Sequence, residues 1–119
     1  MYNSHVMDIK ALTKAMHQFV RDKGWYQPNT HRPQTPKNLA ISLSIEAAEI
    51  LEHFQWHEAS PQPKKLEGEL ADVALYLLQL ASVCNIDLEK AILEKLENNY
   101  FRTWDQSTKQ DKDEHDNEN

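Results

Sequence analysis

The stretches that decide the fold are SIEAAEILEHFQW at residues 44–56 and GELADVALYLLQLA at residues 68–81. Each stretch holds a conspicuous pair of acids three positions apart, namely Glu46 with Glu49 in the first, which also contains Glu52, and Glu69 with Asp72 in the second. Because residues three apart project from the same side of a helix, each pair forms one acidic edge. If the four acids converge between two packed helices, they need a hard cation, since unpaired buried carboxylates are costly. Oxygen-only ligation favours Mg²⁺ or Mn²⁺.

The second acidic pair opens an apolar run from Leu70 to Val83. Its only residues with polar side-chain groups are Asp72, Tyr76, Gln79 and Ser82. An acid in such surroundings needs a partner, so this pair is harder to read as an ordinary solvated helix face. The run also makes this helix apolar almost all round, with Ala71, Leu75 and Leu78 on the side away from the acids. A domain of this size rarely buries a helix from two directions, so the pattern predicts a dimer or a tetramer.

Composition favours an all-α protein. The chain has 119 residues, of which 39% are hydrophobic, and only two glycines, too few for the turns of a many-stranded sheet. Its single cysteine, Cys84, and the lack of a signal peptide or a run of about 18 apolar residues indicate a reducing compartment. We therefore expect a cytoplasmic protein that does not enter membranes. No basic patch suggests a nucleic-acid polymer as partner.

Four helices are expected, at residues 6–23, 36–58, 61–85 and 88–103. Gly24 should end the first, while Thr35-Pro36 and Ser60-Pro61 are typical pairs of N-cap and first helical residue for the second and third. The proline-rich segment 25–35 is longer than a usual connection and is a candidate binding loop or lid. Together these elements predict a compact four-helix bundle.

The two ends of the chain differ in character. Residues 1–104 should form the helical domain that carries the acids, and residues 105–119 an acidic tail. The tail holds six acids and two lysines, a balance of −4 within a net charge of −6, and no large apolar residue. Such a segment cannot offset the entropy of ordering and is expected to be disordered.

Several further residues have two interpretations. Trp25, Trp56 and Tyr76 are either core and rim aromatics or groups that stack on a base. Lys95, Asn99 and Arg102 share a helical stripe that either contacts phosphates or is an ordinary solvated face.

Two kinds of metal site are disfavoured because the chain lacks their complete motifs. His53 and His57 have the spacing of a zinc helix, but no Glu follows His53, and neither acidic pair continues to the histidine of a di-iron bundle.

The order of these motifs resembles the MazG-type all-alpha nucleoside triphosphate pyrophosphohydrolases, and within them the branch that includes the dCTP pyrophosphatases. The match consists of E-x-x-E at Glu46/Glu49, a spacer of 19 residues and E-x-x-D at Glu69/Asp72. It extends to Pro36-Lys37-Asn38-Leu39, Phe54-Gln55-Trp56, Tyr76, and Lys95 with Asn99 and Arg102. The resemblance covers about residues 9–103. In the segment before Pro36, Gln34 stands where that branch has a histidine.

The resemblance implies a four-carboxylate Mg²⁺ site formed by Glu46, Glu49, Glu69 and Asp72. It implies that Trp25, Trp56 and Tyr76 enclose the base, and that Lys95 and Asn99 approach the triphosphate or sugar. The residue types favour attack by a water on the α-phosphate, with Glu49 as general base and with Lys95 and Arg102 stabilising the leaving pyrophosphate. The substrate expected is a pyrimidine or modified deoxynucleotide, in nucleotide-pool house-cleaning.

Two other functions compete with this hypothesis. The acids could bind structural Mg²⁺ in a non-catalytic helical interaction module, which would have no use for the three aromatics or for Lys95 and Asn99. Alternatively, the chain could catalyse another phosphohydrolase reaction, on phosphoribosyl-ATP or a dUTP-like substrate.

Overall fold

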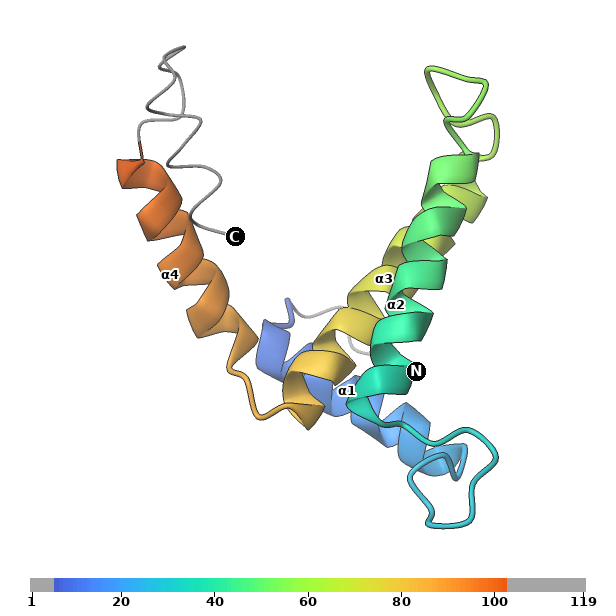
Figure 1. Ribbon diagram of the computed structural model, residues 1–119, viewed down its shortest axis with the longest axis vertical. Coiled ribbons are helices and arrows are strands. Elements are labelled where there is room, and N and C mark those ends of the chain that lie inside the picture. Colours follow the sequence, from blue (N-terminus) through green and yellow to red (C-terminus); the bar gives the residue numbers. More distant parts are fainter. Residues whose placement is uncertain (1–5, 103–119) are drawn as a thin grey trace. The chain divides into compact units, whose positions relative to one another are not determined.

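A computed structural model of the chain describes residues 6–102, and within that range it contains four helices and no strand (Figure 1). The helices are α1 (Ile9–Asp22), α2 (Pro36–Glu52), α3 (Pro63–Val83) and α4 (Leu88–Phe101). The all-α prediction is therefore confirmed for the part of the chain that the structure describes. The expected acidic tail at 105–119 lies outside the described residues.

The chain divides into two units, with the boundary between Leu88 and Glu89. Helices α1, α2 and α3 belong to the first unit, and α4 forms the described part of the second. Among residues 6–102, no single helix is both long and apolar enough to cross a membrane.

Helix α1 begins at Ile9, three residues later than predicted, because Asp8 caps it. The Asp8 carboxylate accepts a hydrogen bond of 2.7 Å from the Ala11 N–H. The helix ends at Asp22, one residue before the predicted end, and Gly24 follows the C-cap residue Lys23 with a φ of +76°, in the left-handed region that favours glycine. The N–H groups of Gly24 and Trp25 donate to the carbonyls of Arg21 and Val20, the pairing of a Schellman motif. This motif turns the chain into segment 25–35.

Helix α2 begins as predicted, with Pro36 as its first residue and the Thr35 hydroxyl accepting the Asn38 N–H at 3.2 Å. It ends at Glu52, however, and the prediction that it continues to 58 was wrong. The N–H of His53 already bonds to the carbonyl three residues back, and the His53 side chain turns towards residues of the following loop and of α3.

The expected N-cap and first residue of α3 were also wrong. Helix α3 begins at Pro63, with Gln62 at the N-cap position, two residues later than the Ser60-Pro61 pair predicted. The Ser60 hydroxyl has other partners. It accepts the Gln62 N–H at 3.1 Å and lies 2.6 Å from Nδ1 of His53. Ser60 therefore orders the end of the loop rather than the first turn of the helix.

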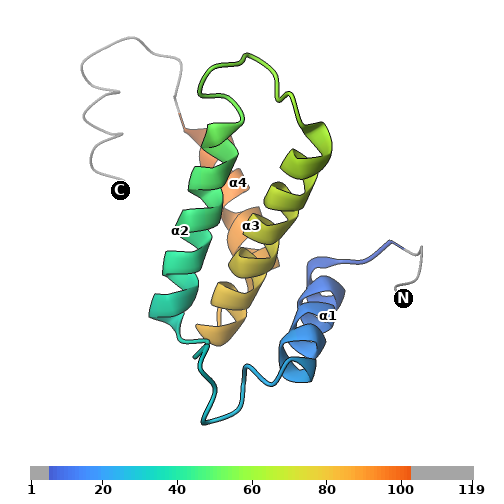
Figure 2. The same ribbon diagram turned by 90° about the vertical axis from the view of Figure 1, so that its right-hand side faces the viewer.

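Helix α3 is the centre of the first unit, since it packs against α2 along its length and against α1 (Figure 2). The buried apolar side chains are Met16, Val20, Leu39, Leu78 and Ala81. The expected burial of α3 from two directions is met only in part within the chain. Leu78 is buried, whereas Leu75 is 43% exposed. Two polar residues of α3, Glu69 and Gln79, are also buried.

The two glycines offer a matched test of this fold. Gly24→Ala should destabilise the protein by about 1–2 kcal/mol, because a Cβ is disfavoured at positive φ. Gly68→Ala, within α3, should stabilise it by up to about 1 kcal/mol, because a Cβ at position 68 meets no atom within 4 Å and alanine favours helix. Urea unfolding of both variants measures the two signs. Equal shifts for both would contradict the left-handed end of α1.

Candidate functional site

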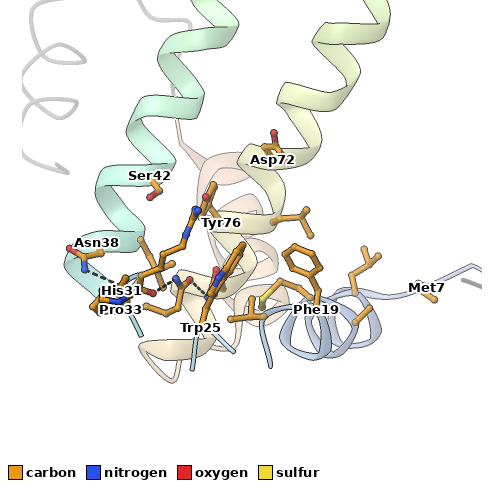
Figure 3. A pocket seen from close by; sticks show the side chains of 18 residues that line it. Met7, Phe19, Trp25, His31, Pro33, Asn38, Ser42, Asp72 and Tyr76 are labelled. Atoms are coloured by element: carbon orange, nitrogen blue, oxygen red, sulfur yellow. Dashed lines mark hydrogen bonds between the residues drawn. The ribbon is translucent and has the colours of Figure 1, made fainter. Parts of the chain in front are cut away.

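A cavity of about 750 Å³ lies in the first unit, between α1, α2, α3 and segment 25–35 (Figure 3). This volume is within the range of about 300–1,000 Å³ typical of small-molecule sites. The aromatic, charged and polar side chains on its wall include Trp25, Arg32, Asn38, Asp72, Tyr76 and Gln79. The α1 side is apolar, with Met16 and Phe19 among its residues. The cavity therefore offers an apolar surface and a polar surface to one ligand.

Three of the residues predicted from the sequence line this cavity together, namely Trp25, Asp72 and Tyr76. Figure 3 shows Trp25, Tyr76 and Asp72 around the cavity, with Asp72 one helical turn before Tyr76 in α3. Asp72, Tyr76 and Gln79 share the cavity wall because positions i, i+4 and i+7 project from one face of a helix. Gln79 was visible in the sequence as a polar residue in an apolar run, but it was given no role. Its helical register with Asp72 was the signal that could have found it.

Trp25 is held from two sides by aromatic and cationic contacts. The guanidinium carbon of Arg32 lies 4.4 Å from the centroid of the Trp25 ring, and Phe19 meets the ring edge-on at 5.6 Å. Both neighbours also line the cavity. Arg32 thus brings a positive charge to the wall that carries Asp72. Sequence reasoning assigned no role to Arg32, because only the fold shows segment 25–35 returning over Trp25.

A hydrogen-bond network ties segment 25–35 to α3. The buried Gln79 donates from Nε2 to Oε1 of Gln34 at 2.8 Å and to the Tyr26 hydroxyl at 3.2 Å. The imidazole of His17 bridges Tyr26 and Ser82, with 2.7 Å on each side. Burial lowers the pKa of His17 and raises the pKa of Tyr26, so both are uncharged at neutral pH. The loop is therefore anchored by neutral polar groups rather than by ion pairs.

Three of the predicted acids act electrostatically on the fourth, Glu46. The pKa of Glu46 is raised, first by burial, then by the charge and a hydrogen bond of Glu49, and further by the charges of Asp72 and Glu69. Glu46 and Glu49 are half-buried on α2, Glu69 is buried on α3 and Asp72 is exposed. Two pairs of acids from two helices therefore share one region of negative potential, as the spacing of the motifs suggested.

The donor types fit a hard divalent cation, since all four groups are carboxylates. A closed coordination shell is not formed by these side chains: among residues 6–102, no three His, Cys, Asp or Glu side chains are grouped as a metal site. Oε2 of Glu69 is hydrogen-bonded to Nε2 of His53. The acids are thus near enough to raise the pKa of Glu46 while their oxygens do not converge on one point.

The remaining predicted residues lie elsewhere. Trp56 is in the loop between α2 and α3, is 82% exposed and is not among the residues that line the cavity. Lys95 and Asn99 are on α4, and Arg102 directly follows that helix, all in the second unit. The roles predicted for these four residues stay predictions.

Comparison with known proteins agrees with these features. Residues 41–116, more than half of the chain, match the model of the MazG-like family, so the chain belongs to that family. Among its relatives, the dCTP pyrophosphatases 1 of Rattus norvegicus and Homo sapiens are each 37% identical to it over an alignment of 94 positions. The match covers 71% of this chain and 52% of each relative. The chain therefore spans about half the length of the curated relatives it matches.

A solved structure is similar as well. The crystal structure of a pyrophosphatase from Archaeoglobus fulgidus superimposes with a TM-score of 0.63 at 36% sequence identity. The match covers 83% of this chain and 94% of that one. The predicted resemblance to the MazG-type proteins and their dCTP pyrophosphatase branch is thereby confirmed.

The raised pKa of Glu46 predicts the sign of a pH effect. The folded, metal-free protein holds the Glu46 proton more tightly than the unfolded chain, so stability falls as pH rises from about 4.5 through the raised pKa. Glu46→Gln should therefore melt at a higher temperature than wild type in EDTA at about pH 7, and the gain should shrink towards pH 4. Thermal unfolding at both pH values measures it. An equal gain from Glu52→Gln, an exposed acid of the same helix, would contradict the local origin of the effect.

Proposed function

We propose that this protein is a Mg²⁺-dependent nucleoside triphosphate pyrophosphohydrolase, which converts a (d)NTP to the monophosphate and pyrophosphate. The observation that carries the proposal is the cavity wall on which Trp25 and Tyr76 accompany Asp72, one of the three acids whose charges raise the pKa of Glu46. Aromatic rings suit a base, and carboxylates suit the cation of a triphosphate. The names of the similar proteins, dCTP pyrophosphatase 1 and a pyrophosphatase, support the same reaction class.

The division of roles follows from residue chemistry. Glu46, Glu49, Glu69 and Asp72 would hold Mg²⁺, or Mn²⁺ in its place. A bound Mg²⁺ would supply charge neutralisation for the phosphates and acidify a coordinated water. Without a cation, the acids would repel the triphosphate. Our proposal gives Glu49 the part of general base, accepting the proton of the attacking water.

The other predicted contacts complete the proposal. Trp25 and Tyr76 stack on the base within the cavity, and Trp56 is a further base contact. Lys95 and Arg102 meet the charge that develops on the leaving pyrophosphate, and Asn99 approaches the triphosphate or sugar. The preferred substrate is a pyrimidine or modified deoxynucleotide, consistent with the dCTP named for the relatives. A role in cytoplasmic nucleotide-pool house-cleaning follows from that preference.

We also propose that the protein works as a homodimer or homotetramer. Large apolar side chains of α2 and α3 remain exposed, including Ile41 at 49%, Ile45 at 55% and Leu70 at 51%. Single hydrophobic residues scattered over a surface are normal, but here three lie on the two helices that carry the acids, which suggests an interface. A second copy of the chain would bury them and hold the two acidic pairs in register.

The central test is an assay over a panel of canonical and modified NTPs and dNTPs, with products separated. We expect release of pyrophosphate from at least one pyrimidine deoxynucleotide, dependent on Mg²⁺. Asp72→Asn, which keeps the shape and removes one charge, should lose most of the activity and gain less thermal stability from Mg²⁺ than wild type does. Orthophosphate as the only first product would refute the reaction. Mg²⁺ binding without any hydrolysis would favour the non-catalytic helical module.

Substitution of the cavity aromatic separates binding from folding. Trp25→Ala should weaken substrate binding by about 1–3 kcal/mol, roughly 5- to 150-fold in KM, because it removes the stacking surface. Trp56→Ala removes an equal side chain outside the cavity of a single chain. Steady-state kinetics of folded protein measure both. An unchanged KM in Trp25→Ala would refute the base site, and an unchanged KM in Trp56→Ala would refute the further base contact proposed for Trp56.

A further inference from the structure

The buried ionisable side chains of the described residues are His53 and Glu69, each 8% exposed. They contact each other through a short hydrogen bond between Nε2 of His53 and Oε2 of Glu69. His53 follows the last residue of α2, and Glu69 lies in the second turn of α3. This contact therefore joins the two helices that carry the acidic pairs, at the acid that is most deeply buried.

The donors and acceptors of this contact form one directed chain. An ionised carboxylate only accepts hydrogen bonds, so Nε2 of His53 donates to Glu69. Nδ1 of a neutral imidazole must then accept, and its partner at 2.6 Å is the Ser60 hydroxyl, which donates its proton. The oxygen of Ser60 accepts in turn from the Gln62 N–H at 3.1 Å. The backbone at the start of α3 thus sets the orientation of Ser60, His53 and finally Glu69.

The chain of hydrogen bonds reaches only one oxygen of Glu69. The hydrogen bond from His53 goes to Oε2 of Glu69, so Oε1 is the oxygen of this carboxylate that a cation would bind. The charge of Glu69 contributes to the raised pKa of Glu46 on the opposite helix, which places the carboxylate within the acidic cluster. A residue that orients a ligating carboxylate through its second oxygen is a common feature of metal sites.

We propose that His53 and Ser60 are positioning residues that hold Glu69 ready for a divalent hard cation. The inference rests on the proposed function, since it takes Glu69 as a ligand of that cation. It goes beyond the acidic motifs because neither residue belongs to them. It also explains the early end of α2: the chain leaves the helix at His53 so that the imidazole can lie between Ser60 and Glu69.

The test measures metal binding in the absence of nucleotide, so it does not depend on turnover. Mn²⁺ serves as the probe, titrated calorimetrically into full-length protein. His53→Leu replaces the imidazole with an apolar side chain of similar size that has no hydrogen-bond donor. This variant should bind Mn²⁺ about 10- to 100-fold more weakly. His57→Leu is the matched control, since His57 is exposed in the same loop, and should bind like wild type. His53→Gln, which can still donate to Glu69, should recover part of the loss.

Two results would overturn the inference. Unchanged affinity in folded His53→Leu would show that Glu69 needs no support, and tighter binding would show that His53 competes with the cation. If His53→Leu does not fold, as judged by circular dichroism in EDTA, Ser60→Ala decides. A weaker affinity for Mn²⁺ in Ser60→Ala supports the chain of hydrogen bonds, and wild-type affinity overturns it. Wild-type protein that binds no Mn²⁺ would instead refute the proposed function itself.

Discussion

The packing of α2 against α3 is the constraint on which the rest of the structure depends, because it brings four carboxylates together at an edge of the core. Such an arrangement opposes folding: burial and the neighbouring charges both raise the pKa of Glu46, so the ionised site costs stability. The helices must supply this energy through apolar contacts. Leu39 at 2% exposure and Leu78 at 9% are among the side chains that do so.

The cavity extends from the acidic edge to the apolar face of α1, and this gradient suits a ligand with one charged and one flat apolar end. Asp72 lies at the charged side, and Phe19 and Met16 line the other. Trp25 and Tyr76 lie between the two as amphipathic rings. Uncharged hydrogen bonds hold this wall together, because Gln79 joins α3 to segment 25–35 through Gln34 and Tyr26. Neutral anchors leave the electrostatic field of the site to the acids and to Arg32.

Local signals predicted those parts of the fold that local chemistry determines. Gly24 and Thr35-Pro36 mark helix ends through backbone conformation and capping, and the structure has both where the sequence indicated. Ser60-Pro61 carries the same signature, but this prediction failed because the Ser60 hydroxyl bonds to His53, seven residues earlier. His53 in turn bonds to Glu69, which lies sixteen residues after His53. The site divides in the same way. Carboxylate spacing revealed the acids, whereas Gln34, Arg32 and His53 acquire their partners only when the chain folds back on itself.

This division has a consequence for how the site is specialised. The acidic pairs lie on two packed helices, where a change of geometry would disturb the core, and they match the motif order of the MazG-type proteins. Segment 25–35 is under a weaker constraint, since its residues contribute no side chain to the buried apolar core. Yet it supplies Trp25, Arg32 and Gln34 to the cavity wall. The resemblance leads us to expect a histidine where this chain has Gln34, and Gln34 accepts a hydrogen bond of 2.8 Å from Gln79. An amide in this place offers both a donor and an acceptor whatever the pH, whereas a histidine changes charge near neutrality. In the proposed function, α2 and α3 thus supply the acids for metal-dependent hydrolysis, and segment 25–35 supplies side chains that determine which base is bound.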